Sequence, residues 1–220
     1  MFLAILRRDL LLSIRGGGGM FQSLIFFALA ILTFSLALGP DLALLAKVAA
    51  PILWAAAMLS TLLSLDRIFQ ADAEDGSLDI DWQATDLPVL LVAAKAVSHW
   101  LTTGLPLIAA TPVLALLLNL PAEGLVPLLL SLACGTPALS LIGTFAAAVT
   151  LPLRRANILM SVLTAPLFTP VLIFGVSAAE SGGHDGSRFL SSILFLSAFS
   201  LLSMVSLPFA SVWAIKSNLD

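Results

Sequence analysis

The side chains that could do chemistry in this 220-residue chain are few, and the acidic ones gather in one segment. The stretch QADAEDGSLDIDWQATD, residues 70–86, holds six of the chain's 13 acidic residues. They are Asp72, Glu74, Asp75, Asp79, Asp81 and Asp86. An enzyme would need a nucleophile, an acid–base pair, a metal cluster or a phosphate-binding loop.

The remaining sequence offers catalysis little support. It contains no GxxxxGK[ST] phosphate loop, no HExxH pair and no CxxC motif. The single cysteine, Cys134, excludes both a disulfide framework and a paired-thiol metal site. We therefore expect a protein that is not an enzyme, with no catalytic residue, no metal site and no nucleotide site of its own.

The two histidines are the other candidates for a site. His184 lies in the polar stretch ESGGHDGSR and is expected to be solvated. His99 lies in AKAVSHWLTTG beside Trp100, at the edge of an apolar block. An ionisable residue there either anchors the chain at the membrane–water interface or contacts a ligand, and both interpretations stay open.

Composition predicts an integral membrane protein. Hydrophobic residues make up 60% of the chain, charged residues only 10%, and the mean hydropathy is +1.08. The apolar residues form blocks of about 20, long enough to cross the hydrocarbon layer as helices. The fold class predicted is all-α, a polytopic membrane protein with six transmembrane helices. The net charge of -3 gives no reason to expect nucleic acid as a partner.

The basic residues predict how the chain is oriented. The six spans predicted are approximately residues 20–38, 42–65, 90–118, 125–151, 158–178 and 189–215. With the N- and C-termini cytoplasmic, eight basic residues lie inside: Arg7, Arg8, Arg15, Arg67, Lys95, Arg154, Arg155 and Lys216. Only Lys47 and Arg188 lie outside. Residues 66–86, between spans two and three, then face the cytoplasm.

Residues 1–220 are expected to form a single membrane domain, with residues 1–19 as an additional N-terminal element. Residues 2–14 carry apolar side chains at helical spacing beside a polar patch, which is typical of a short amphipathic interfacial helix. Gly16 to Gly19 would separate it from the first span as a glycine linker. The alternative is a plain extension of the first span. Arg7, Arg8 and Asp9 interrupt the apolar run that a cleavable signal peptide requires.

The acidic segment, residues 66–86, also contains apolar side chains that a solvated loop does not need. These are Ile68, Phe69, Leu78, Ile80 and Trp82. Gly76 and Ser77 are expected to interrupt the helix, with Ser77 capping the next one. Apolar anchors among charges favour docking into a groove of another protein, and a plain cytoplasmic loop is the alternative.

Three blocks, FQADAEDGSLD, AKAVSHWLTTGLPL and CGTPALSLIGTFAAAVTLPLRR, occur in an order that resembles the haem exporter protein B (CcmB) family. Members of this family are a membrane subunit of the cytochrome c maturation haem-export ABC transporter, and they are similar to ABC-2-type permeases. The resemblance implies that the segment between spans two and three is a coupling helix that contacts the ATP-hydrolysing subunit. The implied ATPase-coupling residues are Phe69, Asp72, Glu74, Asp75, Gly76 and Ser77.

The resemblance also implies a function and a set of partners. The chain would be a permease subunit in the bacterial inner membrane, needed for haem delivery to the periplasm during c-type cytochrome biogenesis. Its partners would be an ATP-binding subunit, other membrane subunits and a haem chaperone, with haem as the possible substrate of the complex. The alternative is a non-transporting scaffold that uses the partner's ATP hydrolysis to release the haem chaperone. The stretch DIDWQATDLPVL departs from the Leu-rich family pattern, so partner contact beyond Leu78 is not implied.

Overall fold

The computed structural model describes residues 2–16, 19–151, 153, 156–182 and 184–219, and in these residues the regular structure is helical throughout. Arg154, Arg155, Gly17 and Gly18 lie outside the described residues. Among the described residues, six helical segments are long and apolar enough to cross a membrane: Phe21–Leu38, Leu42–Glu74, Pro88–Leu117, Ala122–Thr150, Ile158–Ser181 and Gly186–Ser217. The all-α, six-span prediction is confirmed.

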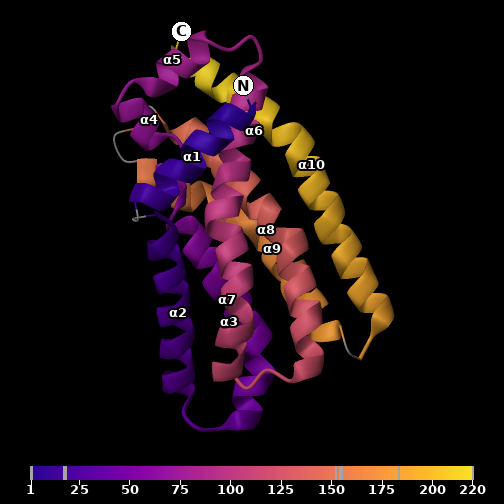
Figure 1. Cartoon of the computed structure of the whole chain (residues 1–220). Helices are drawn as coiled ribbons and strands as arrows, with labels where there is room; N and C mark the ends of the chain where they lie inside the picture. The colour runs from indigo at the N-terminus through magenta and orange to yellow at the C-terminus, as the bar shows by residue number, and fades with distance from the viewer. Residues whose placement is uncertain (1, 17–18, 152, 154–155, 183, 220) are drawn as a thin grey trace.

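The two chain ends lie at the same end of the helix bundle (Figure 1). The acidic segment lies there too, while the connections between α2 and α3, α7 and α8, and α9 and α10 lie at the opposite end (Figure 1). This arrangement agrees with an even number of spans. That this end faces the cytoplasm is a prediction from the positions of Lys and Arg.

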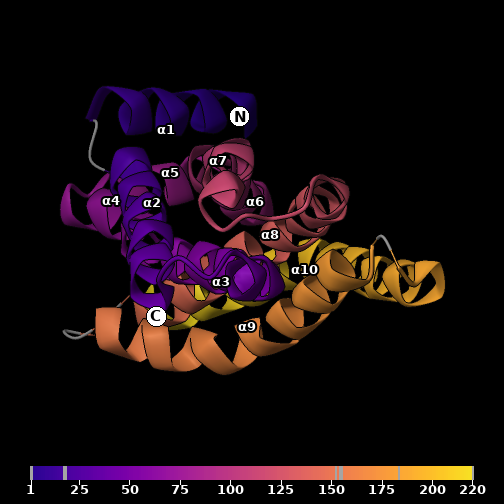
Figure 2. The same cartoon turned by 90° about the horizontal axis from the view of Figure 1, so that it is seen from below.

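The N-terminal helix α1 (Phe2–Gly16) is separate from the first span, α2 (Gly19–Leu38). It crosses the end of the bundle obliquely and lies along one edge, where it packs on α6 (Figures 1 and 2). Its Ile5 is buried, whereas Leu3 and Leu11 are exposed on the other side. The helix thus buries only part of its apolar side chains against the bundle, and its location at the membrane interface remains a prediction.

The second span leads into the acidic segment through a series of short helices. Helix α3 (Leu42–Leu62) is capped by Asp41, whose Oδ1 accepts the N–H groups of Ala43 and Leu44, both at 3.0 Å. It is followed by the 3₁₀ turn η1 (Leu65–Arg67), α4 (Gln70–Glu74) and α5 (Ser77–Gln83). Such short helices are not stable alone, so tertiary contacts must hold α4 and α5 in place.

The third span contains a π-helical turn. Helix α6 (Pro88–His99) runs into η2 (Trp100–Gly104) and then into α7 (Leu105–Leu117). Pro106, the second residue after the turn, has no N–H to donate, which interrupts the regular α-helical hydrogen-bond ladder. The wider turn brings Thr102 and Thr103, both buried, to the same region as His99.

The second half of the chain packs around α8. Helices α8 (Ala122–Thr150), α9 (Ala156–Ser181) and α10 (Gly186–Leu219) contact one another along their lengths. Trp54 of α3 is fully buried here, and its indole Nε1 donates to Ser131 Oγ of α8 at 2.9 Å. A Cβ at Gly135 or Gly175 would lie 2.6 or 2.4 Å from this indole ring. The two glycines therefore make the space that the ring occupies.

Candidate functional site

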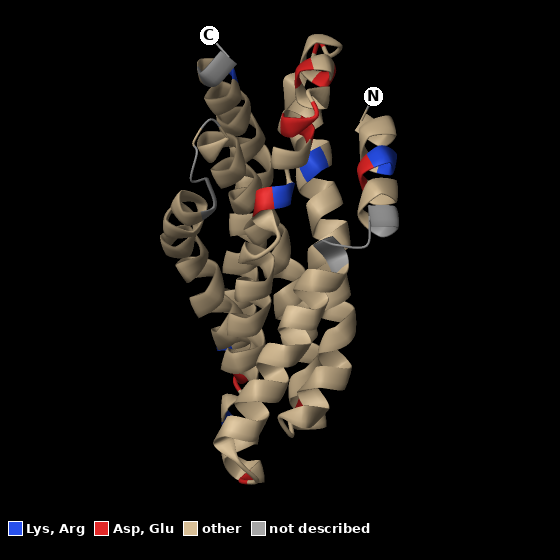
Figure 3. Ribbon diagram, turned by 90° about the vertical axis from the view of Figure 1, so that its left-hand side faces the viewer, with Lys and Arg blue, Asp and Glu red and all other residues tan. Residues whose placement is uncertain are grey.

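Charged side chains concentrate at the end of the bundle that carries the termini and the acidic segment (Figure 3). Acidic residues of α4 and α5 lie at this end of the molecule, and basic residues of α1 and α6 lie nearby. This end is the most polar part of an otherwise apolar bundle. It is therefore the candidate functional site.

Most of the apolar side chains in the acidic segment point into the protein. Phe69 is 1% exposed and Leu78 5% exposed, and both belong to the same apolar core as the spans. Ile68 is buried as well, and Trp82 is half-buried. Only Ile80, 69% exposed, presents a large apolar side chain to the outside. Phe69, Leu78 and Ile68 therefore anchor the acidic segment to the chain's own bundle.

The turn between α4 and α5 is built by Asp75, Gly76 and Ser77. Gly76 has a φ of 75°, a left-handed conformation that glycine adopts without strain. Ser77 is the first residue of α5 rather than its cap; its N–H donates to Asp75 Oδ1 at 2.8 Å. Hydrogen bonds from the Ser77 side chain and backbone N–H lower the pKa of Asp75 below its ordinary value. The predicted break of the helix at Gly76 and Ser77 is therefore correct, but the predicted capping of α5 by Ser77 is wrong.

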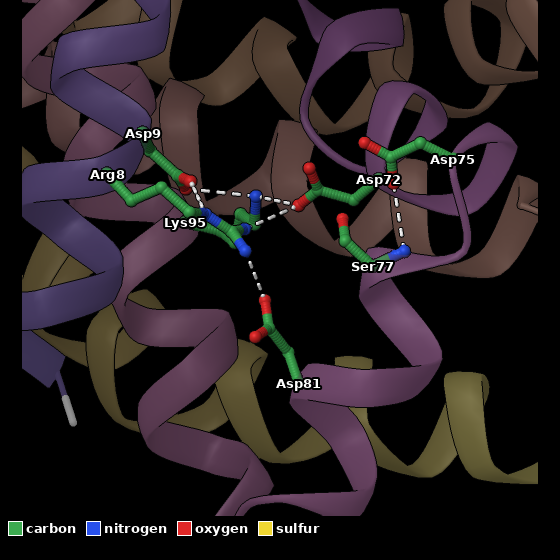
Figure 4. A network of polar contacts seen from close by, with 7 residues as sticks. All are labelled: Arg8, Asp9, Asp72, Asp75, Ser77, Asp81 and Lys95. Atoms are coloured by element: carbon green, nitrogen blue, oxygen red, sulfur yellow. Dashed lines mark hydrogen bonds and ion pairs between the residues drawn. The ribbon is translucent and has the colours of Figure 1, made fainter.

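Five charged side chains form a network that we call the ionic cluster: Arg8, Asp9, Asp72, Asp81 and Lys95 (Figure 4).

Lys95 lies at the centre of the ionic cluster. Its side chain is 6% exposed, and its Nζ pairs with Asp72 Oδ2 and, at 2.9 Å, with Asp9 Oδ2. The Arg8 guanidinium, a half-buried group, contacts Asp72 at 3.1 Å, Asp81 at 2.8 Å and Asp9 at 3.3 Å. The cluster therefore joins α1, α4, α5 and α6.

Sequence reasoning did not find the ionic cluster. Asp72 lies 64 residues from Arg8 and 23 from Lys95, so no local spacing links these charges. The one available signal was Lys95, a charge near the start of an apolar block, because such charges need a partner.

The six predicted coupling residues thus divide into three groups. Glu74 and Asp75 are exposed, Gly76 and Ser77 are half-buried in the turn, and Phe69 and Asp72 are buried. Two further acids of the segment, Asp79 and Asp86, are also exposed. The outward surface of the segment is consequently acidic, with Ile80 as its apolar side chain.

His99 lies inside the protein and is 7% exposed. Its Nε2 lies 2.8 Å from Ser64 Oγ and its Nδ1 3.0 Å from Ser140 Oγ. Both ring nitrogens therefore have hydroxyl partners, one after α3 and one on α8. The neighbouring Trp100 Nε1 donates to Thr136 Oγ1 at 3.0 Å. His99 thus connects three parts of the bundle, while His184 is exposed as expected.

Two clefts open near the acidic segment. The first, about 260 Å³, lies between α1, η1, α4 and the third span, with Asp72, Lys95 and His99 in its wall. The second, about 220 Å³, lies between the acidic segment and α8 and α9. Asp66 lines it, and its Oδ1 is buried without a hydrogen-bond partner among the described residues. In those residues no set of His, Cys, Asp and Glu is arranged to hold a metal ion.

Comparisons with known proteins give a consistent result. The family model described as "CcmB protein" matches residues 1–218. The chain is 45% identical over 217 residues to heme exporter protein B of Bradyrhizobium diazoefficiens, covering 99% of this chain and 98% of that protein. It is 46% identical over 217 residues to heme exporter protein B of Paracoccus denitrificans, covering 98% and 99%. The same-named protein of Escherichia coli K12 is 40% identical over 227 residues and is covered completely.

Proposed function

The chain belongs to the CcmB protein family, and from that premise we propose that it is the permease subunit of an ABC transporter that exports haem for c-type cytochrome biogenesis. Six membrane-spanning segments and relatives named heme exporter protein B support this role. The chain carries no nucleotide-binding motif, so the ATP is hydrolysed by a separate subunit. The complex resides in the bacterial inner membrane.

The observation that carries the proposal is the outward surface of the acidic segment. Glu74, Asp75 and Asp79 are exposed at this end of the bundle, and Ile80 is exposed on the same segment. A surface of this kind fits a partner with a basic rim around an apolar pocket, because complementary charge guides docking and a buried apolar side chain adds affinity. We assign that partner surface to the ATP-hydrolysing subunit.

The coupling residues then have different tasks. Glu74 and Asp75 meet the partner, and Gly76 with Ser77 sets the direction of α5. Phe69 and Asp72 transmit the motion inward, because they are the contacts through which α4 rests on the bundle. A rigid inward connection is needed for ATP-driven movement of the segment to reach the spans.

A second candidate is a scaffold that uses the partner's ATP hydrolysis to release a haem chaperone. The burial of His99, the candidate ligand contact, favours it, since this residue is 7% exposed. The nitrogens of His99 are also both engaged with hydroxyl groups of the same chain. In this case the haem stays on other chains, and the acidic segment still binds the ATPase.

Both candidate functions require the acidic segment to bind the ATP-hydrolysing subunit, and this step is tested by reversing charges on the outward surface. In Glu74→Lys/Asp75→Lys, membrane recruitment of the ATP-hydrolysing subunit and c-type cytochrome formation should both be lost. Glu123→Lys is the matched control, because Glu123 is an exposed acid in the first turn of α8, which begins at the opposite end of the bundle. Full recruitment by the double variant would overturn the proposal.

The two candidates are separated by single-cysteine accessibility in a background without Cys134. A permease should show a continuous water-accessible stripe along the spans that changes between the ATP-bound and nucleotide-free complex. Accessibility confined to the ends of the spans in both states would instead support the scaffold.

A further inference from the structure

The ionic cluster connects the N-terminal helix to the acidic segment. Helix α1 packs on α6, and its side chains Arg8 and Asp9 reach toward the charges of α4, α5 and α6 (Figure 4). Arg8 contacts one carboxylate from α1, one from α4 and one from α5. A single guanidinium thus bridges three elements, and its planar, multiple donors suit this geometry.

The acidic segment is held on two sides by contacts of different kinds. On the side of the spans, Phe69 and Leu78 are buried in the apolar core. On the side of α1, the contacts are charges: Asp72 with Lys95 and Arg8, and Asp81 with Arg8. Apolar contacts tolerate sliding because they have no direction, whereas charge-assisted hydrogen bonds fix position.

The burial of Lys95 makes the ionic contacts hard to separate. Its side chain is 6% exposed, and those of Asp9 and Asp72 are 10% exposed. If α4 moved away alone, the ammonium group would lose a carboxylate partner in a poorly solvated site, which is unfavourable. A displacement of α4 and α5 therefore carries α1 and α6 with it.

We propose that the ionic cluster is a mechanical link that makes the N-terminal helix part of the coupling apparatus, with Arg8 and Lys95 as positioning residues. The inference rests on the proposed function and adds to it a second route for motion. One route runs through Phe69 into the apolar core of the spans, and the other runs through Asp72 and the rest of the cluster into α6 and α1. An oblique helix with an exposed apolar face then moves together with the ATP-driven segment.

The experiment distinguishes a cluster that transmits motion from one that only stabilises the fold. It removes one positive and one negative charge of the cluster together. Lys95→Met alone leaves Asp9 and Asp72 facing each other, so this variant tests stability as much as coupling. Asp72→Asn/Lys95→Met removes one charge of each sign and leaves the net charge of the cluster unchanged. Neutral replacement of a buried ion pair is often tolerated in folding, so the double variant should melt close to the unaltered protein.

Three quantities are measured on the whole complex in membranes: ATPase recruitment, the rate of ATP hydrolysis, and c-type cytochrome formed per ATP hydrolysed. For Asp72→Asn/Lys95→Met we expect unchanged recruitment and hydrolysis, with cytochrome per ATP reduced about tenfold. Arg8→Gln should show the same loss, and Arg8→Lys should retain part of the coupling. Arg7→Gln is the control, because Arg7 is an exposed arginine on the same helix outside the cluster.

The outcomes distinguish this inference from the proposed function. Normal cytochrome per ATP in both the double variant and Arg8→Gln overturns the link. So does a loss that merely follows the amount of folded protein in every variant. If the charge reversals at Glu74 and Asp75 leave recruitment intact, the proposed function itself fails. If those reversals abolish recruitment while the cluster variants behave normally, only the link fails.

Discussion

Replacement of Phe69 by alanine tests how the acidic segment is attached to the bundle. The family resemblance implies that Phe69 contacts the ATPase, whereas the structure buries it at 1% exposure in the chain's own core. If the burial describes its role, Phe69→Ala removes an internal anchor. Its main effect should then be on stability, and any loss of ATPase recruitment should follow from it.

The expected magnitude follows from the burial. Truncating a fully buried phenylalanine to alanine costs about 3–5 kcal/mol, which includes the cavity left behind. Ile80, on the same segment, is 69% exposed, and replacing such a surface side chain usually changes stability by less than about 0.5 kcal/mol. The two variants should therefore differ in stability by at least about 2.5 kcal/mol.

The assay combines thermal unfolding of the detergent-solubilised protein with recruitment of the ATP-hydrolysing subunit to membranes. Phe69→Ala should unfold at a clearly lower temperature, and Phe69→Leu, which refills most of the volume, should recover both stability and recruitment. Ile80→Ala should unfold normally and recruit less ATPase, because its side chain is the exposed apolar one on the outward surface.

A Phe69→Ala protein as stable as Ile80→Ala would refute this reasoning. If that stable variant also failed to recruit the ATPase, Phe69 would be a docking anchor, and the segment would have to open to expose it.

Further substitutions test the turn and the bundle core. Gly76→Ala should cost about 1 kcal/mol in melting experiments because its φ is 75°, with Gly76→Asn tolerated better. The hydrogen bonds of Ser77 to Asp75 lower the pKa of Asp75, so they should stabilise the turn above the ordinary carboxyl pKa of 3.8 and be lost as the pH falls through the lowered value. Hydrogen exchange of α5, corrected for intrinsic rates, should therefore rise in acid. Asp75→Asn should abolish this pH dependence. Gly175→Ala should lower stability by about 1–3 kcal/mol because its Cβ would lie 2.4 Å from a buried indole ring, whereas Gly186→Ala, with nothing within 4 Å, should unfold like the unaltered protein. His99→Ala should cost about 1–3 kcal/mol through lost buried hydrogen bonds and leave ATPase recruitment intact; full stability with lost haem delivery would instead identify a ligand contact.

Properties that depend on local composition were readable from the chain alone. Blocks of about 20 apolar residues predict spans because a helix must be that long to cross the hydrocarbon layer. The break at Gly76 was predictable for a similarly local reason, since glycine adopts the left-handed conformation without strain. The even number of spans also determined that both termini lie at the same end.

The direction in which each side chain points was decided by the tertiary structure. The acidic segment contains four aliphatic or aromatic side chains of similar apolar character: Ile68, Phe69, Leu78 and Ile80. The first three are buried and Ile80 is exposed, because only one face of this short segment packs against the bundle. The ionic cluster depends on packing in the same way. Arg8 meets Asp72 and Asp81 across 64 and 73 residues of chain, and only the crossing of α1 over the end of the bundle brings them within hydrogen-bond distance. Local spacing records which charges a helix carries, and the packing of helices determines which charges meet.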